Sequence, residues 1–275
     1  MAANLVRAGF ELSVWTRTSE KAERFAGEHG ARAAGTPREA AEGADAVITM
    51  VSDSPQVESV LFERSGAAAS LEPGAMVVDM STIAPTASRR IGERLAGEDI
   101  DFVEAPVSGS RPGAEGGTLT IMAGGQEAAF QRAMPLFEAM GERIVHVGPL
   151  GHAQLAKLLT NVMGAVGAAA LAESVVAVRK AGIDREAFLE VAAGSAGNSA
   201  MLTLKGRPIF EGDFQPLFKL EHMLKDIRHC LAEAEALGVE LRLGRLVEGL
   251  YARAMELGHG EDDFGAVITA VENAG

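Results

Sequence analysis

Cysteine is almost absent from this sequence, since Cys230 is the only one among 275 residues. A single cysteine excludes an internal disulfide and is typical of a reducing compartment. The N-terminus lacks the charged and then apolar pattern of a secretory signal. The most apolar stretch, residues 162–172, is rich in glycine and alanine and too short to cross a bilayer. These absences predict a cytoplasmic protein without a membrane partner.

Basic residues are also in short supply. The chain has 25 lysines and arginines against 38 aspartates and glutamates, which gives a formal net charge of −13. It contains no basic block and no basic residues interleaved with aromatics, so nucleic acids and anionic membranes are not expected partners. A local basic pocket for a small anion is still compatible with this total.

The first half of the sequence alternates short apolar runs with helix-like stretches. The apolar runs, which we expect to be strands, cover residues 12–15, 46–51, 76–80, 102–107, 119–123 and 144–147. The stretches between them, which we expect to be helices, cover residues 20–28, 37–42, 55–61, 85–95 and 126–140. Such alternation predicts an α/β domain in which helices cover both faces of a doubly wound, Rossmann-like parallel sheet.

Strand signals stop after Gly148, and the rest of the chain reads as helical. The expected helices cover residues 150–181, 184–193, 199–205, 219–237, 241–257 and 262–273. We therefore expect a dinucleotide-binding domain over residues 1–148 and an all-helical domain over residues 149–275. The stretch from Gly164 to Gly167 permits close helix contact, either inside one subunit or between subunits.

A lysine and an asparagine stand four residues apart in the segment from Gly151 to Asn161. This spacing places Lys157 and Asn161 on one face of the expected helix. Their neighbours are mostly apolar, so we expect the helix to be buried almost all round. Burial would move the lysine pKa toward neutrality and suit it to proton transfer. The alternative is a lysine whose stem lies along apolar surface while its ammonium group reaches solvent.

Three loops follow expected strands, at the edge where open parallel sheets bind ligands. In the first, the hydroxyl of Ser108 and the backbone around Gly109 could hold a carboxylate, although most Ser-Gly pairs are only turns. The other two carry Val51 with Ser52, and Thr82. They would either border a nucleotide or simply cap the helices that follow.

These segments resemble the signatures of the β-hydroxyacid dehydrogenase family over essentially the whole chain. Residues 105–109 with 117–119 are similar to its substrate signature, and residues 151–161 to its catalytic signature. Lys225-Asp226 is similar to a pair that reaches the active site from the helical domain. Ser110-Arg111 and the stretch over residues 205–226 resemble the glyoxylate and succinic semialdehyde reductase branch more than 3-hydroxyisobutyrate dehydrogenase.

The resemblance implies a hydride transfer between a nicotinamide and a small aldehyde or keto acid. Lys157 would be the general acid/base, and Asn161 would orient it or the substrate. Ser108 and Gly109 would hold the substrate carboxylate. In the same family pattern, Thr82 and Lys225 would border the cofactor, Lys225 would also contact substrate, and Ser110 would help to select it. A homodimer or homotetramer is expected.

The cofactor is expected to be NADP in preference to NAD. The strand that ends at Trp15 is followed by Arg17 and Thr18, with no acidic residue to bind a ribose 2′-hydroxyl. A guanidinium with hydroxyl neighbours suits a 2′-phosphate. The alternative is an exposed arginine at an ordinary helix start.

Two departures from the family pattern matter. Ala153 stands where a second glycine is common, which is a mild change. In addition, residues 1–9 look like the helix that should follow a first strand and a glycine-rich phosphate loop, and no GxGxxG motif occurs. We therefore expect a sheet without its first strand, with a gap or a shifted strand beside the strand that ends at Trp15. We also expect this form to bind cofactor poorly and to be less stable than a form extended upstream. An internal methionine taken as the start would explain the pattern.

Three other functions are weighed against this one. They are an NAD-dependent 3-hydroxyisobutyrate dehydrogenase, an imine reductase, which Lys157 disfavours, and a non-catalytic binding protein without a phosphate loop. A metal site is not expected, because charged residues crowd the helix face that carries His222, Asp226 and His229. Glu104 and Asp101 show no spacing typical of an acid/base pair.

Overall fold

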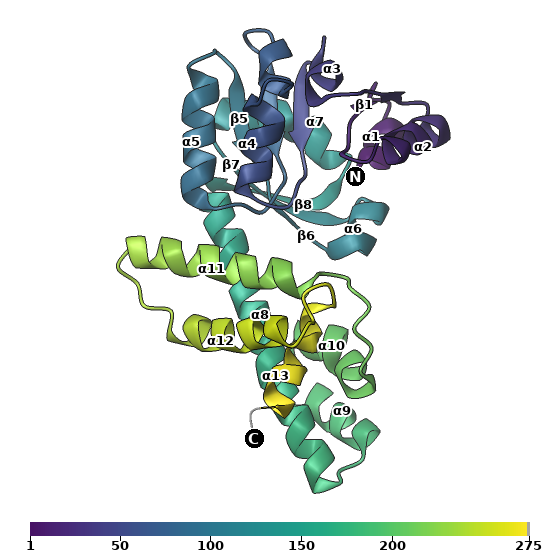
Figure 1. The fold of residues 1–275 in the computed structure, drawn as a ribbon, viewed down its shortest axis with the longest axis vertical. Coiled ribbons are helices and arrows are strands. Elements are labelled where there is room, and N and C mark those ends of the chain that lie inside the picture. The colour runs from purple at the N-terminus through teal and green to yellow at the C-terminus, as the bar shows by residue number, and fades with distance from the viewer. Residues whose placement is uncertain (274–275) are drawn as a thin grey trace. The chain divides into compact units, whose positions relative to one another are not determined.

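The computed structural model describes residues 1–273. These divide into a compact unit over Met1–Lys157 and a second unit that begins at Leu158. The first unit is an α/β domain and the second is all helical, so the expected fold class is confirmed (Figure 1). The two units are joined within one long helix, α8 (His152–Ala181).

The strands lie close to the apolar runs in the sequence. They are β1 (Ser13–Val14), β2 (Arg32–Ala33), β3 (Ala46–Thr49), β4 (Met76–Asp79), β5 (Asp101–Glu104), β6 (Val107–Ser108), β7 (Leu119–Gly124) and β8 (Gly141–Gly148). Strands β3, β4 and β5 are parallel neighbours, whereas β7 is antiparallel to both β5 and β6 and parallel to β8. The sheet is therefore mixed, because β7 runs antiparallel to β5 and to β6. The strand expected over residues 102–107 is interrupted, and its two parts are β5 and β6.

Most helices of the first unit also match the expected stretches. They are α1 (Ala2–Arg7), α2 (Ser19–His29), α3 (Pro37–Ala41), α4 (Ser54–Phe62), α5 (Pro85–Ala96), α6 (Ser110–Gly116) and α7 (Glu127–Glu138), with a 3-10 turn over Ala67–Ser70. Helix α6 was not expected, since its Arg-Pro-Gly sequence resembles a turn. Proline at the first helical positions of α3, α4 and α5 starts these helices with a preset φ angle.

A cavity separates β1 from β3 in the first unit. Within the described residues, β1 pairs only with β2, and these two strands form a sheet of their own. The cavity has a volume of about 1280 Å³, and its lining includes Val14, Ile48 and Leu136. The expectation of a gap beside the strand that ends near Trp15 is thus confirmed.

The second unit packs its helices around α8. They are α9 (Arg185–Ala193), α10 (Ala200–Glu211), α11 (Leu220–Ala236), α12 (Arg242–Glu256) and α13 (Ile268–Glu272), the last preceded by a 3-10 turn over Phe264–Val267. Ala165, Ala168 and Ala172 of α8 are fully buried in the core of this unit. By length and composition α8 could span a membrane, yet this face is the centre of a helical core.

Helix α8 is not buried all round, contrary to expectation. Met163 is 73% exposed and Leu159 is 38% exposed, so one apolar strip of the helix faces outward in the single chain. Helix α10 also runs past the expected end at residue 205, because Pro208 is accommodated inside it.

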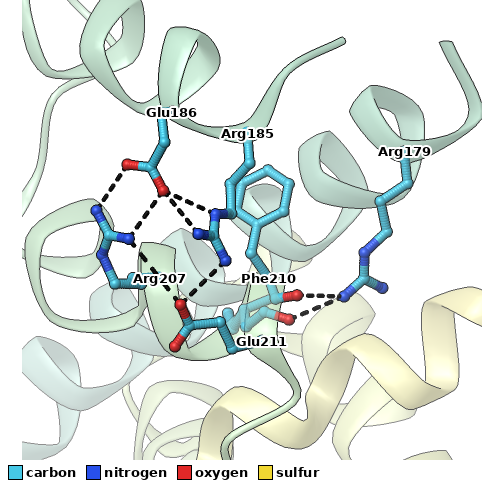
Figure 2. Close-up of polar contacts among 7 residues, drawn as sticks. Arg179, Arg185, Glu186, Arg207, Phe210 and Glu211 are labelled. Carbon is cyan, nitrogen blue, oxygen red and sulfur yellow. Dashed lines mark hydrogen bonds and ion pairs between the residues drawn. The ribbon is translucent and has the colours of Figure 1, made fainter. Parts of the chain in front are cut away.

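Exposed ion pairs tie α9 to α10, as Figure 2 shows. Glu186 accepts two hydrogen bonds from Arg207 at 2.8 and 2.7 Å, and Arg185 contacts both Glu186 and Glu211. Exposed pairs of this kind contribute little stability individually, so the buried apolar faces hold this unit together.

Candidate active site

Three polar side chains stand at the last positions of three neighbouring parallel strands. Thr49 of β3 is in register with Asp79 of β4, and Asp79 is in register with Glu104 of β5. All three are buried, and both carboxyl groups are completely inaccessible to solvent. The carboxyl-terminal edge of the sheet therefore carries two adjacent carboxyl groups inside the protein.

Asp79 is held by hydrogen bonds from the neighbouring strand β3 and from the loop that follows β4. The Thr49 hydroxyl donates to Oδ1 at 2.7 Å, and the Ser81 backbone N–H donates to the same oxygen at 3.1 Å. Burial raises the pKa of Asp79 to about 6, although hydrogen bonds from Ser81 and Thr49 oppose the rise, and the Glu104 charge adds to it. Within residues 1–273 the other oxygen, Oδ2, has no hydrogen-bond partner.

Glu104 accepts hydrogen bonds from the first turn of α8. The backbone N–H of Gly151 donates to Oε2 at 2.8 Å, while those of Ala153 and Gln154 donate to Oε1 at 2.8 and 3.2 Å. The hydroxyl of Ser88 on α5 donates to Oε2 as well. Burial raises the pKa of Glu104 in spite of these bonds. The carboxyl group thus satisfies backbone donors that a helix start leaves without an intrahelical partner.

Gln154 makes a second connection between α8 and the sheet edge. Its side chain is fully buried. Its amide nitrogen donates to the Ser81 carbonyl at 2.9 Å, and its amide oxygen accepts from the Ile83 N–H at 3.1 Å. These two bonds enclose Thr82, which is half-buried in the loop after β4.

Lys157 lies one turn further along α8 and is 8% exposed. Its burial favours the proton-transfer interpretation over a lysine whose head reaches solvent. Asn161 follows one turn later, in the second unit, and donates to Asp226 Oδ2 at 2.6 Å. Asp226 is fully buried and forms an ion pair with Lys225 at 3.1 Å. The contact of Lys225 with substrate or cofactor stays a prediction.

The expected substrate loop is a sharp turn from β6 into α6. Ser108, Gly109 and Ser110 are all exposed. Gly109 has a φ of 134°, and a Cβ at this position would lie 3.1 Å from the Leu119 side chain. Ser110 has a φ of 52°, in a region that non-glycine residues seldom adopt. Backbone strain of this kind clusters at functional sites, so the loop fits a binding role.

The residues expected to border a nucleotide follow β1, β3 and β4. Arg17 and Thr18 are exposed after β1, and Thr18 caps α2 without a side-chain hydrogen bond to it. Val51 is joined to the next loop, because its N–H donates to the Ser81 hydroxyl at 2.9 Å. Ser52 is exposed beside Val51. The loops after β3 and β4 are therefore brought together, whereas Arg17 and Thr18 stand on the separate two-stranded sheet.

Asp79, Glu104 and Gln154 were not recognised as site residues from the sequence. The only available signal was an acidic residue at the end of a buried apolar strand, in Met76–Asp79 and again in Asp101–Glu104. Within residues 1–273, no group of three histidine, cysteine or acidic side chains is arranged to hold a metal ion.

Comparisons with known proteins match this architecture along almost the whole chain. Residues 1–148 match the NAD-binding domain of 6-phosphogluconate dehydrogenase, and residues 151–271 match the NAD-binding family of NADP-dependent 3-hydroxyisobutyrate dehydrogenase. Glyoxylate/succinic semialdehyde reductase 1 of Arabidopsis thaliana is 33% identical over 272 residues, which are 99% of this chain and 94% of the relative.

Two further proteins are similar to this chain over nearly its whole length. The 2-hydroxy-3-oxopropionate reductase of Escherichia coli is 35% identical over 99% of this chain and 92% of its own. The crystal structure of 3-hydroxyisobutyrate dehydrogenase from Salmonella typhimurium has a TM-score of 0.89 at 29% identity, and covers 98% of this chain and 94% of that one. The chain therefore belongs to the NAD(P)-dependent β-hydroxyacid dehydrogenases and semialdehyde reductases.

Proposed function

We propose that this protein reduces small aldehyde or keto acids of the glyoxylate and succinic semialdehyde type with NADPH, and that Lys157 is its general acid/base. The observation that carries the proposal is the burial of Lys157 in a helix turn that directly follows the Glu104 hydrogen bonds. Burying an ammonium group costs free energy, and proton transfer to a developing alkoxide is a function that would explain its position.

Residues that follow β1 and residues that follow β4 would suit the two ends of a dinucleotide. At the adenosine end, Arg17 is exposed beside the start of α2, which no side chain caps. A guanidinium and a helix N-terminus together suit a 2′-phosphate. At the other end, the loop that contains Thr82 is fixed by Gln154.

The nicotinamide would supply the hydride for reduction or accept it in oxidation. Lys157 would deliver a proton to the carbonyl oxygen as its charge grows, and Asn161 would orient the ammonium group or the substrate. Ser108 and the backbone at Gly109 would hold the substrate carboxylate, and Ser110 would help to select the chain length. A positioned proton donor contributes roughly 10²–10⁴-fold to such a reaction.

Replacing Lys157 with alanine tests this proposal. We expect kcat for glyoxylate and for succinic semialdehyde to fall by roughly 10²–10⁴-fold while NADPH still raises the melting temperature. Lys157→Arg should fail as well, because a guanidinium does not release its proton near neutral pH. Lys180→Ala is the matched control, since this lysine is exposed at the other end of the same helix.

More than a tenth of wild-type kcat in Lys157→Ala would contradict the proposed role. Parallel assays with 3-hydroxyisobutyrate and NAD test the alternative, an NAD-dependent 3-hydroxyisobutyrate dehydrogenase. A higher kcat/KM with this substrate and cofactor would favour that alternative.

We further propose that the enzyme works in the cytoplasm as a homodimer or homotetramer. Support comes from large apolar side chains left exposed on the second unit, among them Met163 at 73%, Leu243 at 64% and Leu246 at 60%. Clustered exposed apolar surface is typical of association sites. Light scattering after size-exclusion chromatography measures the mass, and a monomer at assay concentration would contradict the proposal.

A further inference from the structure

We propose that Glu104 is a positioning residue for catalysis: its carboxylate fixes the first turn of α8 to the end of β5 and thereby sets the location of Lys157. This inference rests on the proposed function, since it assigns a role to Glu104 through Lys157. It concerns contacts inside the first unit.

The first argument is the number and direction of the hydrogen bonds. Glu104 has three backbone donors at the start of α8, on Gly151 just before the helix and on Ala153 and Gln154 within it, with distances between 2.8 and 3.2 Å. An ordinary helix cap satisfies one or two such donors from a residue next to the helix in sequence. Here the acceptor stands 47 to 50 positions earlier in the chain, on a strand. The contact therefore fixes a helix to a sheet.

The second argument is the cost of the arrangement. Glu104 is completely buried, and burial raises its pKa. An ionised carboxylate at this position therefore lowers the stability of the folded protein. The positive end of the α8 dipole and the backbone donors offset part of this cost. A neutral or apolar residue would fill this buried position without that desolvation cost. The presence of a carboxylate therefore indicates that its hydrogen bonds to the start of α8 are needed.

The third argument is what the contact connects. Glu104 is followed directly by the segment that leads to Ser108, which is predicted to bind the substrate carboxylate. Ala153, which donates to Glu104, is one helical turn before Lys157. The side chain of a helical residue leans toward the turn that precedes it, so Lys157 lies over the turn that Glu104 fixes. One side chain thus sets the spacing between substrate loop and proton donor.

Gln154 supplies an independent restraint from the same turn. It bonds to the Ser81 carbonyl and the Ile83 N–H, on either side of Thr82. The start of α8 is therefore tied both to the end of β5 and to the loop after β4. Because misplacement of a catalytic group by about 1 Å can cost about 10²-fold in rate, loosening this turn should be visible in kcat.

The test replaces Glu104 with glutamine, which keeps the length but removes the charge. Its amide nitrogen would face the Gly151 N–H and the Ser88 hydroxyl. We expect kcat to fall by roughly 10- to 100-fold while KM for substrate and for NADPH changes less than about twofold. In the cofactor-free protein, amide exchange of residues 151–157 should become at least about tenfold faster than in the wild type.

Ser88→Ala is the matched control. It removes a buried donor to the same carboxylate but leaves every bond from Glu104 to α8, so kcat and exchange at residues 151–157 should stay within about twofold of wild type. If Glu104→Gln does not fold, the Glu104→Asp variant tests the proposed role of Glu104 in its place. It keeps the charge but is one methylene shorter, and kcat should still fall by at least about fivefold at unchanged KM.

Wild-type kcat, within about twofold, in either folded Glu104 variant would overturn the inference. An equal rise in KM and fall in kcat would do so too, because general loosening of the site produces that pattern. The proposed function fails separately, on an active Lys157→Ala variant, and faster exchange at residues 151–157 in Glu104→Gln would still be measurable in that case.

Discussion

Replacing Asp79 with asparagine should change how the stability of the first unit depends on pH. Burial raises the pKa of this carboxyl group from 3.8 to about 6. A folded-state pKa above the unfolded value means that the folded protein binds the proton more tightly. The contribution of the protonated group to stability is therefore complete below about pH 3.8 and is lost as the pH rises through about 6.

The size of this effect follows from the shift. About two pKa units at roughly 1.4 kcal/mol each give about 3 kcal/mol as the cost of ionising Asp79 in the folded protein. Local rearrangement and water entry reduce such values, so we expect about 1–3 kcal/mol. Asparagine keeps an acceptor for the Thr49 hydroxyl and the Ser81 N–H, and it never ionises. Its amide nitrogen would replace Oδ2, which has no hydrogen-bond partner among residues 1–273, and this adds a cost that does not depend on pH.

The readout is therefore the difference in unfolding free energy between Asp79→Asn and wild type, measured by urea denaturation from pH 4 to pH 8. This difference should move in favour of the variant by about 1–3 kcal/mol across the range, with most of the change between about pH 4 and pH 6 and little above that. Asp45→Asn is the control, because Asp45 is an exposed carboxylate just before β3. A difference that stays constant to within about 0.5 kcal/mol between pH 4 and pH 8 would refute the reasoning, as would a carboxyl NMR titration midpoint near 4 for Asp79.

Two further predictions concern ligand binding. Ser108→Ala should raise KM for acid substrates more than it lowers kcat, because loss of a hydrogen bond to a charged group costs about 1.5–3 kcal/mol. Steady-state kinetics with aldehydes that carry a carboxylate and with neutral aldehydes measures this. Identical changes in KM and kcat for the two substrate classes would show that Ser108 does not bind the carboxylate. Arg17→Ala should weaken NADPH binding and spare NADH, since only the former has a 2′-phosphate for the guanidinium to contact. Titration with both cofactors checks this, and equal losses, or tighter NADH binding by the wild type, would contradict it.

Much of the architecture could be predicted from the sequence because buried strands are short apolar runs between polar residues. The segments at β3, β4 and β5 have this form, and the change to helices after Gly148 is equally plain. The antiparallel direction of β7 was missed, because an apolar run predicts a strand but not its direction. The strand expected over residues 102–107 is also divided into β5 and β6, because Ala105-Pro106 interrupts it. The two-residue strand β2 leaves almost no periodic signal.

The candidate site was predicted only in part, for a physical reason. Lys157 and Asn161 are four residues apart on one helix, so local geometry alone relates them. The contact of Glu104 with Ala153 depends on how a strand and a helix meet in three dimensions. The register that aligns Asp79 with Glu104 likewise depends on strand pairing, which the order of residues does not specify.

The cavity beside β1 has a consequence for motion. Among the described residues, β1 is hydrogen-bonded to β2 alone, and the cavity separates it from β3. A two-stranded sheet with little apolar cover is marginally stable in water. The segment from β1 through α2 to β2 is therefore expected to open as a local unit at a lower free energy than the strands β3 to β5. Arg17 is carried by this segment, so if it contacts the cofactor as proposed, cofactor affinity would fall in proportion to the fraction of molecules in which the segment is open.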